Sequence, residues 1–189
     1  MNRQISLSQY RTIDLALMTG LMAVSQFVIQ IAVSRWCAEQ TGYIVSPVAT
    51  VVALVMMRWS LWAAIPAVVG GVFLTLLSRG TAEQMLIYGA GNLLAMLALL
   101  FLKIVGKERV RGNTVLSLTF AVLVQLLMQF GRAAVAFLLR HPLPACWDFI
   151  TTDAMSILFT MVIIWVVRRV EGLFEDQKHY LLRIQQEQS

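Results

Sequence analysis

The chain has 189 residues, of which 59% are hydrophobic and 13% charged, and its formal net charge is +5. A soluble domain averages about 45–50% apolar and about 25% charged residues, so both fractions depart from the average in the same direction. This composition excludes a soluble enzyme, a disordered chain and a disulfide-stapled secreted module, and it predicts an all-α polytopic membrane protein.

Six apolar segments are predicted to cross the membrane as helices, since each crossing needs about 20 apolar residues. In chain order they are residues 13–33, 43–57, 61–77, 85–102, 115–139 and 149–167. The first continues without a small-residue cleavage site, so we expect a permanent span and not a signal peptide. The second and third are separated by only three residues, which predicts a tight helical hairpin. All of 1–189 forms one membrane domain, and 170–189 is predicted to be an amphipathic tail lying on the membrane surface or on a partner.

The lysines and arginines of alternating loops predict the orientation, because cytoplasmic loops carry an excess of them. One side has three: Arg35, Arg79 and Arg140. The other side has eleven: Arg3, Arg11, Arg58, Lys103, Lys107, Arg109, Arg111, Arg168, Arg169, Lys178 and Arg183. We therefore expect a multi-pass protein of the cell membrane with both termini in the cytoplasm.

Polar residues inside the fifth segment are the strongest pointer to function, because burying them in hydrocarbon is unfavourable. Gln125, Gln129 and Arg132 stand at i, i+4 and i+7 and therefore share one helical face. Two interpretations of Arg132 are equally favoured. It pairs with Asp153 as a structural contact, or it receives an anionic or carbonyl-bearing ligand.

Further polar residues are expected at a similar outward depth. Gln26 and Gln30 lie in the first segment, and Tyr88 and Asn92 lie in the fourth. Each one alone is better explained by interhelical hydrogen bonding, worth about 0.6 kcal/mol per contact in membranes. Their convergence on one half of the membrane favours a polar pocket open to the outside, lying under the first external loop. Two aromatic pairs complete the predicted pocket: Trp36 and Tyr43 in that loop, and Trp147 and Tyr88 as stacking faces.

Small residues in the inner half of the first segment indicate close helix packing. Ala16, Gly20 and Ala23 interrupt a helix otherwise rich in Leu and Met. Such residues let two helix backbones approach each other, either within this chain or against another membrane subunit.

No motif for nucleotide binding, metal ligation or nucleophilic catalysis occurs in the sequence, so we expect no cofactor, no resident metal and no enzymatic activity. Cys37 and Cys146 are both predicted outside, where two free thiols are favoured over a disulfide.

Two segments resemble the substrate-binding S-components of energy-coupling factor (ECF) transporters. The first is the Leu/Met-rich stretch 14–26 with Ala16, Gly20 and Ala23, and the second is the glycine-asparagine start of the fourth helix at 88–95. The resemblance implies a six-helix subunit that captures a vitamin-like small molecule near the outer surface. It also implies that the first helix docks on a transmembrane coupling subunit that works with two cytoplasmic ATPases. Asn92 matches the family's substrate-lining region by position.

Two features depart from that family: the tail after Arg169 is longer than expected, and the N-terminus lacks the early histidine of the nickel and cobalt members. The expected function is thus nutrient capture for an ATP-driven importer, with the lipid bilayer and no nucleic acid among its partners. A stand-alone secondary transporter that uses Arg132 and Asp153, and a non-transporting membrane scaffold, are the alternatives.

Overall fold

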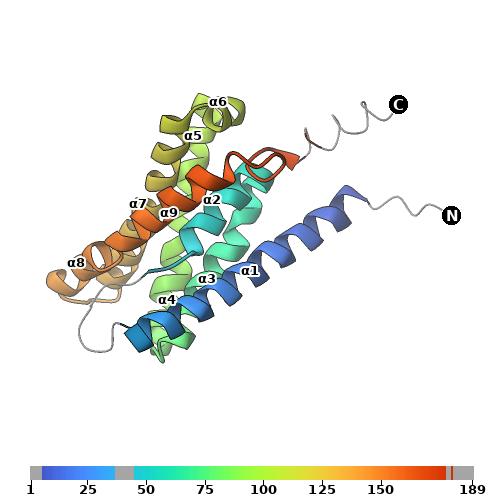
Figure 1. Ribbon diagram of the computed structural model, residues 1–189. Coiled ribbons are helices and arrows are strands. Elements are labelled where there is room, and N and C mark those ends of the chain that lie inside the picture. Colours follow the sequence, from blue (N-terminus) through green and yellow to red (C-terminus); the bar gives the residue numbers. More distant parts are fainter. Residues whose placement is uncertain (1–5, 37–44, 178–179, 181–189) are drawn as a thin grey trace, which may run out of the picture.

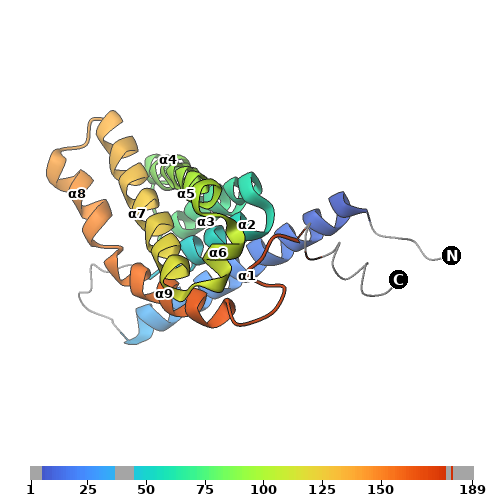
Figure 2. The ribbon, with the colours of Figure 1, turned by 90° about the horizontal axis from the view of Figure 1, so that it is seen from above.

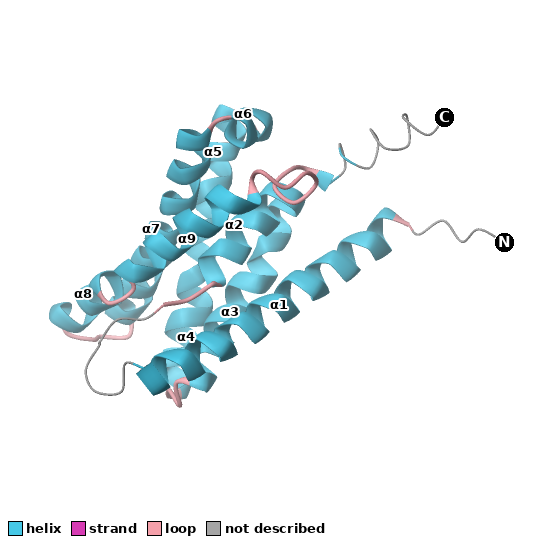
Figure 3. Ribbon diagram, viewed as in Figure 1, coloured by secondary structure: helices cyan, strands magenta, loops and turns pink. Residues whose placement is uncertain are grey.

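The computed structural model describes residues 6–36, 45–177 and 180, and within these ranges the only regular structure is helical (Figure 3). The longest elements are α1 (Leu7–Trp36) and α7 (Thr114–Leu138). The others, in chain order, are α2 (Val48–Trp59), the 3-10 helix η1 (Ser60–Ala63), α3 (Ala64–Leu77), α4 (Ala82–Gly91), the 3-10 helix η2 (Asn92–Leu97), α5 (Ala98–Val105), α6 (Lys107–Gly112), α8 (Leu143–Thr151) and α9 (Ala154–Val167).

Within the described residues, five helical runs are long and apolar enough to cross a membrane, and one of them contains a reversal of the chain. The runs are Leu7–Val33, Val48–Leu77, Ala82–Val105, Thr114–Leu138 and Leu143–Val167. In the second run Ser60 has a φ of 55°, and a Cβ added to Gly70 would lie 2.7 Å from Val48. Residues 22 positions apart can meet only if α2 and α3 are antiparallel, since a straight helix would separate them by about 33 Å. This geometry is the hairpin expected from the short spacing between the two segments (Figure 1).

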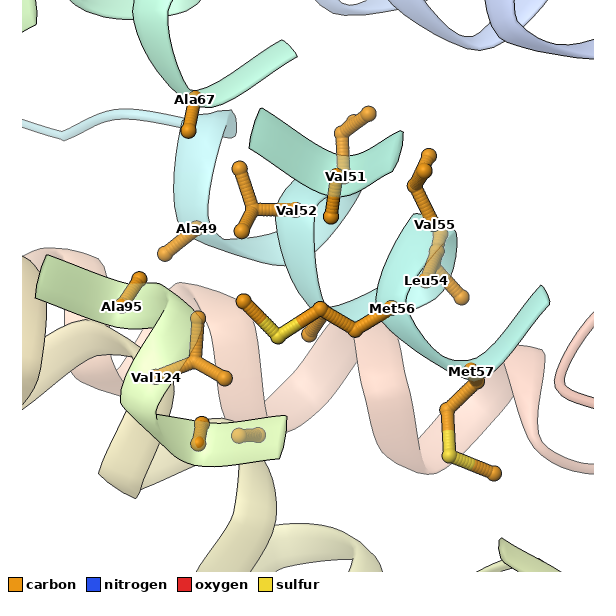
Figure 4. Close-up of a cluster of buried hydrophobic side chains, with 14 of the residues drawn as sticks. Ala49, Val51, Val52, Leu54, Val55, Met56, Met57, Ala67, Ala95 and Val124 are labelled. Carbon is orange, nitrogen blue, oxygen red and sulfur yellow. The ribbon is translucent and has the colours of Figure 1, made fainter. Parts of the chain in front are cut away.

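Helix α2 lies at the centre of the bundle, and all twelve of its residues are buried. It packs against α1, α3, α7 and α9, and its valines and methionines meet Ala67, Ala95 and Val124 in the core (Figure 4). A helix that is apolar on every side is stable only when neighbours surround it. At about 1.5 Å per residue α2 is about 18 Å long, which is well short of the hydrocarbon thickness of about 30 Å.

Helix α1 lies along one side of the bundle (Figures 1 and 2), and hydrogen bonds hold it at two points, one near the end of α2 and one just before α2 begins. Near its start, Asp14 accepts hydrogen bonds of 2.7 and 2.8 Å from the guanidinium of Arg58. Twelve residues further on, the Gln26 carbonyl accepts a 2.9 Å bond from the Ser46 hydroxyl. The opposite face of α1 is exposed, as expected of a helix that faces lipid.

Only the start of the predicted amphipathic tail lies within the described residues, and there it is not a continuous helix. Residues 168–175 form turns and bends, and residues 172–177, here called the C-terminal clasp, pack on the bundle. The side chain of Phe174 is 1% exposed, and the Arg58 guanidinium donates to the Gly172 carbonyl oxygen at 2.5 Å. The acidic residues of the clasp pair with basic residues of α6. Lys107 Nζ lies 2.7 Å from the carboxylate of Asp176, and Arg111 contacts Glu175. Most of the remaining predicted tail lies outside the described residues.

The two ends of the described chain meet at the clasp. The Tyr10 hydroxyl donates to the side-chain oxygen of Gln177 at 3.2 Å. In the part of the chain that the structure describes, six helical legs, counting α2 and α3 separately and joining α8 to α9, therefore start and finish at the same end of the bundle. This end also gathers Arg58, Lys107 and Arg111, which belong to the predicted cytoplasmic set.

Candidate functional site

Three glycines bring α3, α4 and α7 into backbone contact at one level of the bundle. A Cβ on Gly91 would lie 2.6 Å from the backbone of Arg132, and one on Gly131 would overlap the carbonyl oxygen of Gly91. On the other side of α4, a Cβ on Gly71 would overlap the carbonyl group of Tyr88. The backbone of α4 is therefore held between α3 and α7, which places the next residue, Asn92, beside Arg132.

Arg132 is the largest fully buried side chain among the described residues, and three groups surround it. Its Nε donates to the Asn92 side-chain oxygen at 2.8 Å, and its Nη1 donates to Asp153 at 2.5 Å. The guanidinium carbon lies 4.6 Å from the centre of the Tyr88 ring, a cation–π distance. Arg132 and Asp153 are each 1% exposed, so the two charges neutralise each other inside the protein.

Asp153 stands where the last helical run is interrupted between α8 and α9, and both of its oxygens have partners. One accepts from Arg132 and, at 2.8 Å, from the Gln125 amide, while the other accepts from the Ser156 hydroxyl. The Ser156 oxygen also accepts a 2.9 Å bond from the backbone N–H of Ser46. Because Ser46 in turn donates to Gln26, the bonds run without a gap from α7 through α9 to α1. We call the whole set the polar cluster: Gln26, Ser46, Asn92, Gln125, Arg132, Asp153 and Ser156.

Gln129 lies one helical turn from both Gln125 and Arg132, and its side chain is 0% exposed. Among the residues that the structure describes, neither its amide nitrogen nor its carbonyl oxygen has a hydrogen-bond partner. The amide nitrogen of Gln26 at the other end of the polar cluster is also buried without a partner. Unsatisfied buried groups are rare in native proteins, because each one costs about 1–3 kcal/mol.

The structure brings together most of the residues expected at the site and separates a few. Tyr88, Asn92, Gln125, Arg132 and Asp153 meet, joined by the contacts described above. The expected stacking residue Trp147 is 62% exposed and points away, and the aromatic partner of Tyr88 is Phe149, with ring centres 5.7 Å apart. Gln30 is half-buried on α1 and takes part in none of the bonds of the polar cluster.

The side chain of Trp36, together with Tyr43 and Cys37, lies outside the described part of the chain, while Cys146 is buried with a free thiol. Ser46 and Ser156 were missed by the sequence reasoning. The spacing of Ser156 three residues after Asp153 was the available signal, since it places both on one helical face.

The small-residue face of α1 borders a groove of 540 Å³ at the clasp half of the bundle. Ala16 and Gly20 are exposed in it and Ala23 is half-buried, with Trp62 and Ile65 forming the opposite wall. No atom lies within 4 Å of the position that a Cβ on Gly20 would take. Gly20 therefore does not serve close packing within the described part of this chain.

Comparison of the chain with family models, curated proteins and solved structures gave no match. Among the described residues, no three His, Cys, Asp or Glu side chains are grouped so that they would hold a metal ion. The described side chains of the site offer hydrogen bonding from buried amides and a paired arginine and aspartate.

Proposed function

We propose that this chain is a membrane-embedded binding subunit of an importer, and that it captures a small vitamin-like nutrient without catalysing a reaction. In this proposal it lies in the cell membrane with both termini in the cytoplasm. Transport is driven by partners resembling those of ECF transporters, namely a transmembrane coupling subunit and two ATPases. The observation that carries the proposal is the pairing of a buried polar site with an open small-residue face on a different helix.

The polar cluster supports the capture step. Burying an ionisable residue in an apolar helical bundle is unfavourable, so such residues are rare. Where they occur, they are candidates for a functional site. The incompletely satisfied amides of Gln129 and Gln26 leave hydrogen-bonding capacity for a ligand. Tyr88 and Phe149 add aromatic surface beside Arg132.

The groove on α1 supports the docking step. No described atom lies within 4 Å of the position that a Cβ on Gly20 would take, so no other described part of this chain packs against it there. Small residues of this kind let a helix of another subunit approach closely. A partner helix seated there would cover Ala16, Gly20 and Ala23. The site and the docking face are on different parts of the fold, so each can be changed without the other.

A secondary transporter is the second candidate, because Arg132 and Asp153 do form a buried ion pair. In such a protein a proton or an ion would compete for the pair during transport. In a membrane scaffold the same ion pair would serve only to hold the helices together.

Uptake and binding measurements separate these functions. Cells expressing the chain with its partners are tested with a labelled panel of vitamins and nucleobases, after ATP depletion or after addition of an uncoupler. We expect uptake to stop on ATP depletion and to survive the uncoupler. The opposite result would identify a secondary transporter, while no uptake and no ligand-induced thermal shift of the purified chain would favour the scaffold.

The variant Gly20→Leu tests the docking face. Because its side chain enters open space, we expect normal folding and ligand binding but at least tenfold slower uptake. Val28→Phe is the matched control, since Val28 is exposed on α1 but does not line the groove. Equal uptake by both variants would refute docking through this face.

A further inference from the structure

The charged residues of the polar cluster are already satisfied by protein groups. Asp153 accepts bonds on both oxygens, and Arg132 donates to Asp153 and Asn92 while its guanidinium lies over Tyr88. A carboxylate ligand would have to compete with Asp153 for Arg132 and would leave one buried negative charge uncompensated. Since uncompensated buried charge is strongly unfavourable, the cluster selects against charged ligands.

In and next to the polar cluster, the unused hydrogen-bonding capacity is uncharged. The side-chain carbonyl oxygen of Gln129 is an acceptor and its amide nitrogen carries two N–H donors, and both atoms are buried without partners among the described residues. The Gln26 amide nitrogen is also unpartnered, because only the side-chain carbonyl oxygen of Gln26 is engaged, by Ser46. A ligand that satisfies these atoms removes an unfavourable term that the unliganded protein carries.

The geometry of a primary amide restricts what can satisfy it. Its C=O and one of its two N–H groups point from the same edge, so a single group that presents N–H and C=O side by side pairs with both atoms at once. A trans peptide bond places its N–H and C=O on opposite sides, and non-proline cis bonds are disfavoured by about 2.5–4 kcal/mol. A ring forces the cis arrangement, as in cyclic amides, imides and cyclic ureas.

We propose that Gln129 is the recognition residue for a neutral ring lactam, meaning a cyclic amide, imide or urea with adjacent N–H and C=O groups. This inference rests on the proposed capture function and names its substrate class. The planar ring donates one hydrogen bond to Gln129 and accepts one from it, and Tyr88 lies against Arg132, one helical turn along α7. The ion pair between Arg132 and Asp153 stays intact and acts as a positioning element.

Thermal unfolding of the purified full-length chain, with three matched sets of probes at millimolar concentration, tests this. The lactams are uracil, hypoxanthine and 2-pyridone; the N-methylated controls are 1,3-dimethyluracil and 1-methyl-2-pyridone; the carboxylates are orotate and nicotinate. We expect at least one lactam to raise the melting temperature, and its N-methylated form to bind at least tenfold more weakly. Orotate is expected to bind more weakly than uracil, because it carries the same ring and a negative charge.

Gln129→Leu provides the second arm. Leucine is similar in size and removes both orphan atoms, so we expect the unliganded variant to be at least as stable as the wild type while lactam binding falls at least tenfold. A structural role for Gln129 would instead make the variant less stable. Lactam binding that survives the substitution, or equal binding of the methylated probes, would overturn the inference.

The outcomes also separate this inference from the proposed function. If carboxylates bind and lactams do not, the substrate class is wrong and the capture function stands. If no probe binds but ATP-dependent uptake is measured, the lactam class is again wrong and the importer remains. If neither binding nor uptake is found, both proposals fall.

Discussion

The buried pair between Arg132 and Asp153 is the contact whose energetics follow most directly from the structure. Removing either partner leaves the other charge uncompensated, which destabilises a folded protein by about 3–5 kcal/mol. The hydrogen bonds that Gln125 and Ser156 donate to Asp153 are expected to contribute less, at the average of about 0.6 kcal/mol per bond in membrane proteins. We therefore expect Arg132→Met and Asp153→Leu each to lower the free energy of unfolding by about 3–5 kcal/mol.

The double variant decides whether the pair acts as a unit. Because an apolar pair of similar volume often replaces a buried ion pair without loss, we expect Arg132→Met/Asp153→Leu to be no less stable than either single variant. The coupling energy should then be on the order of 3 kcal/mol. Unfolding in mixed micelles by titrated SDS, followed by tryptophan fluorescence, measures all four proteins, with Gln125→Leu as a control that loses about 0.6 kcal/mol. A double variant that loses the sum of the two single effects would refute the reasoning.

Two further predictions concern packing. Gly131→Ala pushes a methyl group into the α4 backbone and should destabilise the protein by about 1–3 kcal/mol, while Gly112→Ala, which has open space around it, should not lower the melting temperature. Equal melting temperatures for the two variants would argue against the close crossing of α4 and α7. Phe174→Ala should cost about 3–5 kcal/mol in the same unfolding assay, because its side chain is buried in the clasp. A loss below about 1 kcal/mol, typical of surface substitutions, would show that the clasp is not packed on the bundle.

The sequence carried enough information to predict one face of α7 and its partner. Gln125, Gln129 and Arg132 share a face because helical periodicity is local, and Asp153 was an identifiable partner because buried charges require compensation. One interpretation of Arg132 paired it with Asp153, and the other gave it to a ligand. The structure contains the ion pair.

The contacts between segments distant in sequence were less predictable. Gly91 and Gly131 are forty residues apart, and nothing local to either one indicates that they meet. The same holds for Ser46 and Ser156, whose bond depends on how α2 and α9 are arranged. Such pairs are specified by the packing of the whole bundle, so periodicity along one helix does not reveal them.

The C-terminal segment illustrates a second limit. Its mixture of apolar and charged residues fits an amphipathic helix, yet Phe174, Glu175 and Gln177 are buried against the bundle. Specific partners, chiefly Arg58 and the bases of α6, outweigh the helical tendency of the segment. Composition predicted an amphipathic surface but not the surface to which it binds.

The complete enclosure of α2 has a consequence for how the protein is made. A helix of twelve residues that carries Arg58 at its end is too short to span a bilayer alone, so we expect α2 and α3 to enter the membrane together as one hairpin. The burial of α2 also depends on α7 and α9, which follow it in the chain. We therefore expect a change that displaces either of these later helices to uncover the apolar side chains of α2.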